Sequence, residues 1–224
     1  MTAALGVPGL GVPKFRIRVP ASWFQFDAWR ATRTADLARI VDAKVEQRGQ
    51  LRPYRGALLR MLRDVAEDAQ RRGALLCAVT ADPVAEAGNL LATLMVFHTP
   101  GSPDADENTV DGIAAGVTAH EGGEGSASWR RVAIVELPPG RAVRVTGVDV
   151  VGEGDHALDV VTMHTLWPAP EGGVVDVVLT SPQIQLTDAL LDLFDAVSGT
   201  FAWAESDADN EADVDADPAP PTTP

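Results

Sequence analysis

The feature that most restricts the fold is a series of four apolar or alternating runs in the C-terminal half of the chain. The runs cover residues 130–137, 141–151, 157–167 and 174–180, and short Pro-, Gly- and Asp-rich segments separate them. Turns of this chemistry join antiparallel neighbours. The pattern therefore predicts a four-stranded antiparallel meander.

Two amphipathic patterns upstream of the meander predict a helical hairpin over residues 34–72. Their apolar stripes are Leu37, Ile40, Val41 and Val45 in the first helix, and Leu58, Leu62, Val65 and Ala69 in the second. Gly49 and Gly73 follow the two stripes as helix stops, and Pro53 suits the first turn of the second helix.

The remaining patterns complete an α+β chain. They are strands at 15–19, 74–80 and 90–98, a short helix at 107–119, and a closing helix at 188–198 that begins as early as Ile184. We therefore predict an antiparallel sheet of about six to seven strands with helices on both faces.

Composition divides the chain into three parts. Residues 1–13 form a flexible lead, residues 14–203 one α+β domain with the hairpin inserted, and residues 204–224 a disordered acidic tail. The tail holds seven acidic and no basic residues, which is half of the net charge of −14. A chain this acidic is a poor nucleic-acid binder, although residues 30–72 carry a local charge of +5.

The sequence shows neither a signal peptide nor an apolar run of the roughly 18 residues that a membrane span needs. We therefore expect a cytoplasmic protein that does not insert into membranes. Its single cysteine, Cys77, lies in an apolar run, which indicates a buried structural thiol. The sequence does not indicate an oligomeric state.

Little in the sequence points to catalysis. The four histidines are His98, His120, His156 and His164, and none has the spacing of a metal pair. No nucleophile elbow or phosphate loop is present, so we predict no catalytic, cofactor or metal site. An enzyme would need His98 or His164 beside a carboxylate such as Asp159 or Glu136 in an open cleft.

The hairpin offers a candidate partner-binding face at Arg52, Arg55, Arg60 and Arg63. One interpretation is an ordinary solvated face with (i, i+4) pairs such as Arg60–Asp64 and Arg63–Glu67. The other is a docking face for an acidic partner, for which the acidic tail competes.

A groove between the sheet and the hairpin is the second candidate site. Its lining would be Trp23, Phe26, Trp29 and His164. The alternative is that the aromatic residues pack in the core and that His164 is a satisfied strand histidine.

The order of elements resembles the PsbP-like α/β/α sandwich of PsbP and of LpqN-type lipoproteins. The residues that carry this resemblance are Phe15–Pro20 with Trp23, the meander, and residues 190–201. The hairpin and the missing lipoprotein signal depart from it. The amino-acid sequences of residues 26–33 and 95–99 also resemble those of uncharacterised actinobacterial proteins, some of them encoded near type VII secretion components.

The resemblance implies a binding or assembly factor and transfers no active site. We therefore expect a non-catalytic protein-binding or adaptor protein, linked to type VII secretion, that acts on a protein partner without a cofactor. The alternative is a small-molecule or lipid-binding protein that uses the groove.

Overall fold

The computed structural model describes residues 14–27, 33–84, 88–119, 130–151 and 158–204. The predicted lead, Trp29, two of the histidines (His120 and His156) and the tail beyond Ala204 lie outside the described residues. None of the described helices is long and apolar enough to span a membrane.

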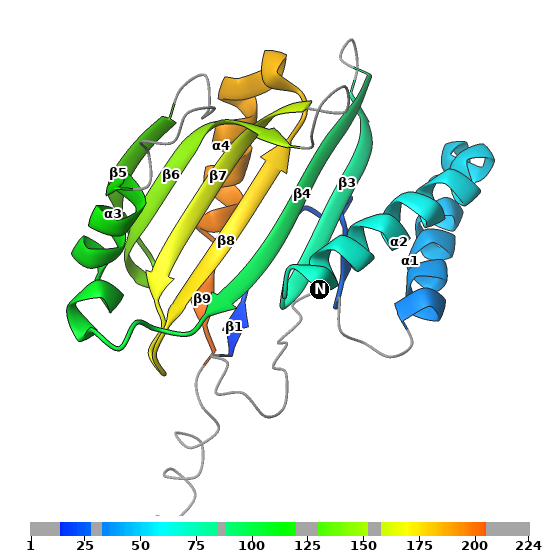
Figure 1. Cartoon of the computed structure of the whole chain (residues 1–224). Coiled ribbons are helices and arrows are strands. Elements are labelled where there is room, and N and C mark those ends of the chain that lie inside the picture. The colour runs from blue at the N-terminus through cyan, green and yellow to red at the C-terminus, as the bar shows by residue number, and fades with distance from the viewer. Residues whose placement is uncertain (1–13, 28–32, 85–87, 120–129, 152–157, 205–224) are drawn as a thin grey trace, which may run out of the picture.

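Seven strands form the main sheet. They are β2 (Phe24–Phe26), β3 (Leu76–Val84), β4 (Gly88–Thr99), β5 (Arg130–Leu137), β6 (Gly140–Val151), β7 (Leu158–Pro168) and β8 (Val174–Ser181). Their order is β2-β3-β4-β8-β7-β6-β5, and all neighbours are antiparallel (Figure 1). The predicted meander from β5 to β8 and the α+β class are both confirmed.

The hairpin of β3 and β4 is longer than the sequence predicts. The sequence predicts that the first of these strands ends at residue 80, but Asp82 and Pro83 pair with Leu90 and Asn89 inside the ladder. The short strand β2 reaches only as far as Val79. Beyond Val79, therefore, β3 is the edge of the sheet, where the missing N–H of a proline costs no ladder hydrogen bond.

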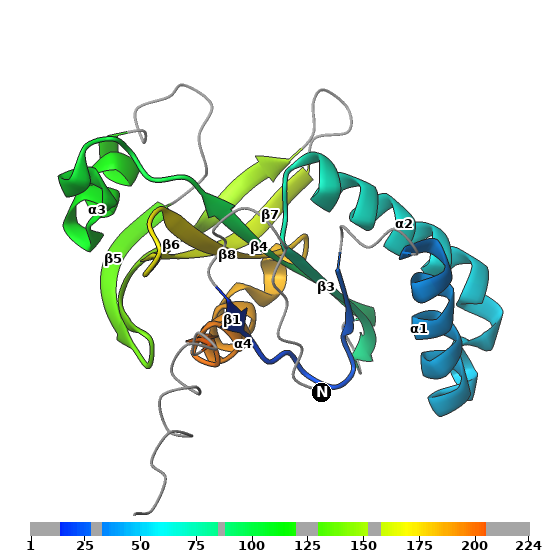
Figure 2. The same ribbon diagram turned by 90° about the horizontal axis from the view of Figure 1, so that it is seen from below.

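Helices cover both faces of the sheet, as predicted. One face carries α4 (Thr187–Ser198), whose Leu190, Phe194 and Val197 join the largest core cluster. The other face carries α1 (Arg33–Gln47), α2 (Arg55–Arg71) and α3 (Val110–Ala119). Figure 2 shows α4 on one side of the sheet, with α2 and α3 on the other.

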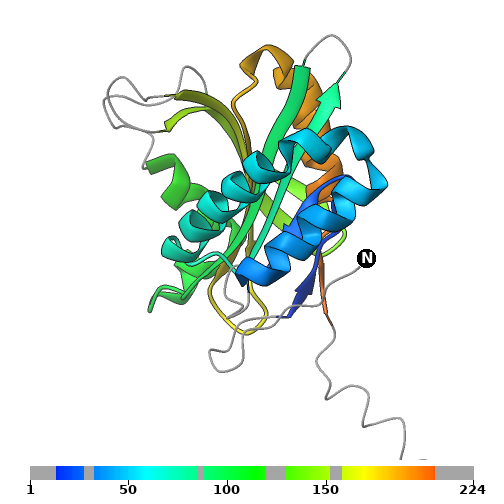
Figure 3. The same ribbon diagram turned by 90° about the vertical axis from the view of Figure 1, so that its right-hand side faces the viewer.

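The helical hairpin of α1 and α2 packs over β3 and one end of β4 (Figure 3). Its predicted stripes are confirmed: Val41 and Leu62 are fully buried among Cys77, Val79 and their neighbours. A 3-10 helix, η1 (Gly49–Tyr54), follows α1 and contains Pro53, so this proline lies before the first turn of α2. Gly73 follows α2 at φ 79°, a conformation that favours glycine.

A second, two-stranded sheet ties the two ends of the described chain together. It pairs β1 (Phe15–Arg16) with β9 (Ala202–Trp203), so the predicted strand at 15–19 is shorter and lies outside the main sheet. The Phe201 ring stacks on Trp167 at a centroid distance of 4.6 Å and on Phe15 at 5.5 Å. These rings fasten the termini to the core on the α4 face.

We expect Phe201→Ala to lower the free energy of unfolding by about 3–5 kcal/mol, because truncation leaves a cavity among buried rings. Phe201 is 1% exposed, whereas Tyr54 is 62% exposed. Tyr54→Ala is therefore the matched control and should change stability by less than about 0.5 kcal/mol. Denaturant unfolding of both variants checks this, and equal losses would contradict a role for the aromatic stack.

Candidate functional site: a pocket and polar strip beside α3

The helices leave the middle of one sheet face uncovered. On this face α2 packs over Cys77 and Met95, and α3 packs over Val143 and Val145. Figure 1 shows β8 and parts of β4 and β7 between these helices. Thr93, His164, Asp176 and Thr180 are partly exposed on this stretch, whereas Thr162 is buried.

We call the polar side chains of this stretch the polar strip. It consists of Thr93, Thr162, His164, Asp176 and Thr180. Thr93, Thr180 and Thr162 lie directly opposite one another on three adjacent strands, and the hydroxyls of Thr93 and Thr180 are 2.6 Å apart.

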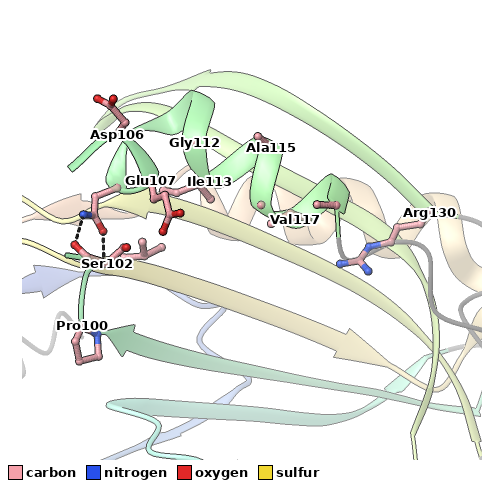
Figure 4. A pocket seen from close by; sticks show the side chains of 13 residues that line it. Pro100, Ser102, Asp106, Glu107, Gly112, Ile113, Ala115, Val117 and Arg130 are labelled. Atoms are coloured by element: carbon pink, nitrogen blue, oxygen red, sulfur yellow. Dashed lines mark hydrogen bonds between the residues drawn. The ribbon is translucent and has the colours of Figure 1, made fainter. Parts of the chain in front are cut away.

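An open pocket lies along α3, on the same face. Its volume is about 830 Å³. Its lining comes from the segment before α3, from α3 itself and from the starts of β5 and β8: Pro100, Ser102, Asp106, Glu107, Asn108, Gly112, Ile113, Ala115, Gly116, Val117, Ala119, Arg130 and Val174 (Figure 4). We call it the α3 pocket. Small and apolar side chains form most of its lining, with charged side chains at its two ends.

Local hydrogen bonds shape the segment that leads into α3. The Asn108 side chain accepts from the Ser102 N–H and donates to the Ser102 carbonyl, both at 2.8 Å. Thr109 Oγ1 accepts from the Gly112 N–H at 3.1 Å and thereby caps α3. These contacts hold residues 102–108 against the start of the helix.

Gly112 permits the close approach of this segment to α3. A Cβ added at Gly112 would lie 2.1 Å from the carbonyl oxygen of Asp106. Only glycine fits there without displacing the backbone of the 3-10 helix η2 (Ala105–Asn108). The shape of this end of the pocket therefore depends on Gly112.

The one His–carboxylate pair among the described residues lies in the polar strip. His164 Nδ1 is 2.9 Å from Asp176 Oδ2. A carboxylate accepts hydrogen bonds, so the proton of this contact belongs to Nδ1. His164 Nε2 bonds no described residue, and the side chain is 29% exposed. The second carboxylate oxygen, Asp176 Oδ1, is buried and also bonds no described residue.

The surroundings of His164 raise its pKa above the ordinary value of 6.5. Burial acts to lower the pKa, but the hydrogen bond and negative charge of Asp176 outweigh it. Asp149 raises the pKa further, and Arg130 opposes it. Folding therefore shifts the protonation equilibrium of His164 toward the imidazolium, relative to the unfolded chain.

The pocket and the strip adjoin each other. Arg130 lies opposite Gly147, and Gly147 lies opposite Thr162, so Arg130 is two strands away from the strip. That separation is roughly 10 Å between Cα atoms. His164 also lies opposite Val145, over which α3 packs. The α3 pocket and His164 therefore lie near each other on the same face of the sheet.

The enzyme hypothesis placed His98 or His164 beside a carboxylate such as Asp159 or Glu136. His164 does have a carboxylate partner, but it is neither of these two. Asp159 lies on the opposite face of β7 from His164, and Glu136 pairs with Arg141 at 3.6 Å. The partner is Asp176, the single charged residue in the valine-rich strand β8. That isolated charge was the signal available in the sequence.

The other predicted chemical groups have structural surroundings. His98 Nε2 contacts the Gly172 carbonyl at 3.0 Å, which ties the end of β4 to the turn before β8. Burial raises the pKa of Cys77 to about 12, in agreement with a structural thiol. Within the described ranges, no group of three or more His, Cys, Asp or Glu side chains is placed to hold a metal ion.

The predicted aromatic groove is wrong. Trp23 is buried in the cluster on the α4 face, whereas Phe26 is buried beneath the helical hairpin on the other face. Side chains of an extended segment point alternately to the two faces of the sheet. Trp23, just before β2, and Phe26, at its end, therefore enter different cores. Of the four predicted residues, only His164 borders the open stretch, and Trp29 lies outside the described residues.

The four predicted arginines are exposed on the hairpin, but they differ in their partners. Arg55 makes two hydrogen bonds to Asp42, at 2.6 and 3.0 Å. Arg52, Arg60 and Arg63 make no ion pair with the described residues, so the expected pairs Arg60–Asp64 and Arg63–Glu67 do not form.

No protein-family model matches this sequence, and no curated protein sequence matches it. Two solved structures are similar in outline. The crystal structure of LpqN, involved in cell envelope biogenesis of Mycobacterium tuberculosis, has a TM-score of 0.44 and 13% identity over 92% of this chain and 90% of LpqN. The solution structure of cyanobacterial PsbP from Synechocystis sp. PCC 6803 has a TM-score of 0.38 and 12% identity over 90% and 98%.

LpqN and PsbP are the two kinds of protein that the order of elements in this sequence resembles. With TM-scores of 0.44 and 0.38, they carry no functional residue over to this chain. The actinobacterial source and the link to type VII secretion stay predictions.

We expect Gly112→Ala to destabilise the fold by about 1–3 kcal/mol, because the new Cβ overlaps the backbone of η2. Gly116→Ala is the matched control on the same helix, since nothing lies within 4 Å of a Cβ added there. It should stabilise the protein by about 0.5–1 kcal/mol. Denaturant unfolding distinguishes the two, and an equal effect of both changes would contradict the close approach.

We expect the His164–Asp176 pair to make stability depend on pH. Because folding raises the pKa of His164, its contribution is fully present below pH 6.5 and is lost as the pH rises through the folded-state pKa. His164→Gln and Asp176→Asn should each remove this component, and His98→Gln should retain it. Unfolding free energies measured at several pH values test this. An unchanged pH profile in His164→Gln would contradict it.

Proposed function

We propose that this chain is a non-catalytic binding protein that holds a small, mainly apolar molecule in the α3 pocket. The observation that carries this proposal is the pocket itself: about 830 Å³, lined mostly by small apolar side chains with a few polar groups. Small-molecule sites typically measure about 300–1,000 Å³ and share this kind of lining. The proposal is the small-molecule alternative of the sequence analysis, moved from the hairpin to α3.

A binding role is favoured over catalysis by the surroundings of His164. Its ring bonds Asp176, and no hydroxyl or thiol of the described residues bonds Nε2 as a nucleophile would. Cys77 is three strands away from His164, under α2, and burial keeps its pKa near 12, so it is protonated at neutral pH. A histidine oriented in this way is suited to hydrogen bonding with a ligand.

An adaptor role through the hairpin is the second candidate. Arg52, Arg60 and Arg63 are exposed and unpaired among the described residues, which supports docking of an acidic partner. On α2, however, Asp64 and Glu67 interrupt the positive charge. A cytoplasmic location and a role near type VII secretion are proposed with this second candidate. Function through this face would survive changes in α3, which is a separate helix.

The proposed function is tested by filling the α3 pocket. Ala115 lines it, whereas Thr118 is exposed on the same helix and does not line it. Ala115→Phe should weaken binding of a neutral apolar fluorescent probe, such as N-phenyl-1-naphthylamine, by about tenfold or more, because the ring occupies the site. Thr118→Phe adds the same ring outside the pocket and should leave the affinity unchanged.

The measurement is fluorescence titration of the full chain, with circular dichroism to verify that both variants fold. Equal affinities in the two variants, or the absence of probe binding to the unaltered chain, would overturn the proposed function.

A further inference from the structure

The α3 pocket has two electrostatically different ends. Asp106 and Glu107 line one end, beside Ser102, and Arg130 lines the other end, beyond Val117 (Figure 4). The guanidinium of Arg130 points toward the space beneath α3 (Figure 4). A charged ligand therefore has one favourable orientation, with a negative group toward Arg130 and away from the two carboxylates.

His164 adds a hydrogen-bonding group on the side of Arg130. Asp176 holds Nδ1, so the ring presents Nε2 away from that carboxylate. In the imidazolium form both ring nitrogens are donors, which makes Nε2 a charged donor without a partner among the described residues. The field of Arg130 acts on His164, as expected for two groups near the same space.

The neighbouring carboxylates are already engaged. Asp176 Oδ2 accepts from His164, and its other oxygen is buried out of reach of a ligand. Asp149 Oδ2 accepts from the hydroxyl of Thr162 at 3.1 Å. On the α2 side, the guanidinium of Arg72 lies over the Phe97 ring at 5.1 Å and pairs with Asp68 at 3.6 Å. Nε2 of His164 is thus the charged donor at this end that bonds no described residue.

We propose that the ligand of the α3 pocket is an amphipathic carboxylic acid, with its apolar part along Ile113, Ala115 and Val117 and its carboxylate between Arg130 and His164. This inference rests on the proposed function and specifies the ligand class of the same site. Charge-assisted hydrogen bonds from arginine and imidazolium are the usual means of holding a carboxylate. The carboxylate also completes the bonding of Nε2.

The test compares molecules of one chain length and three head groups: decanoate, 1-decanol and decyltrimethylammonium. Displacement of the neutral probe from the full chain is measured for each molecule, at concentrations below its critical micelle concentration. Decanoate should bind about tenfold more tightly than decanol, and decyltrimethylammonium should bind most weakly. The affinity of decanoate should fall as the pH rises through the folded-state pKa of His164, because Nε2 then loses its proton.

Variants of Arg130 and of His164 test whether these two side chains hold the carboxylate. Arg130→Gln and His164→Gln should each weaken decanoate by about tenfold and change decanol by less than about twofold. His164→Gln should also remove the pH dependence. Arg131→Gln is the matched control, because Arg131 follows Arg130 on β5, points to the opposite face and does not line the pocket.

The outcomes separate the two proposals. If all three molecules bind equally and Ala115→Phe blocks them, the carboxylate assignment is overturned and the apolar pocket stands. If decyltrimethylammonium binds most tightly, the assignment is overturned in favour of the acceptors of the strip. If nothing displaces or binds in the pocket, the proposed function fails, and the carboxylate assignment fails with it.

Discussion

The pairing of β4 with β8 is the contact on which the rest of the structure depends. It joins Thr93–Thr99 to Val174–Thr180, residues about eighty positions apart in the chain. On one side of this junction lie the helical hairpin and its β3–β4 support; on the other lie the meander and α3. The two helical coverings therefore stop short of each other, and the strands that meet at the junction keep one face partly open.

The polar strip is a consequence of this opening. Thr93 comes from β4, Thr180 and Asp176 from β8, and His164 from β7, so the strip exists only when these strands lie side by side. A partly buried carboxylate and imidazole are costly unless paired, and here Asp176 Oδ2 and His164 Nδ1 pair with each other. The same opening leaves Nε2 of His164 accessible. His164 therefore pairs with Asp176 through one ring nitrogen and offers the other ring nitrogen for hydrogen bonding.

Sequence patterns predicted the elements well because each depends on neighbours a few residues away. The meander strands were placed within a residue or two, and the stripes of α1 and α2 are buried as expected. The errors have local causes too. The strand predicted to end at residue 80 continues through Pro83, which lies on a strand edge where proline is tolerated. The aromatic cluster suggested a groove, but alternation divides Trp23 and Phe26 between two cores.

The sequence by itself determined the α+β class, the meander, the two amphipathic helices and the buried character of Cys77, because hydrophobic periodicity and turn chemistry are short-range. Only the tertiary structure decided which carboxylate meets His164, where the sheet face stays open, and that Gly112 lets α3 form a pocket beside it. These features require contacts between strands far apart in the chain. Strand order is set by the fit of whole faces to their helices, which no single stretch of residues contains.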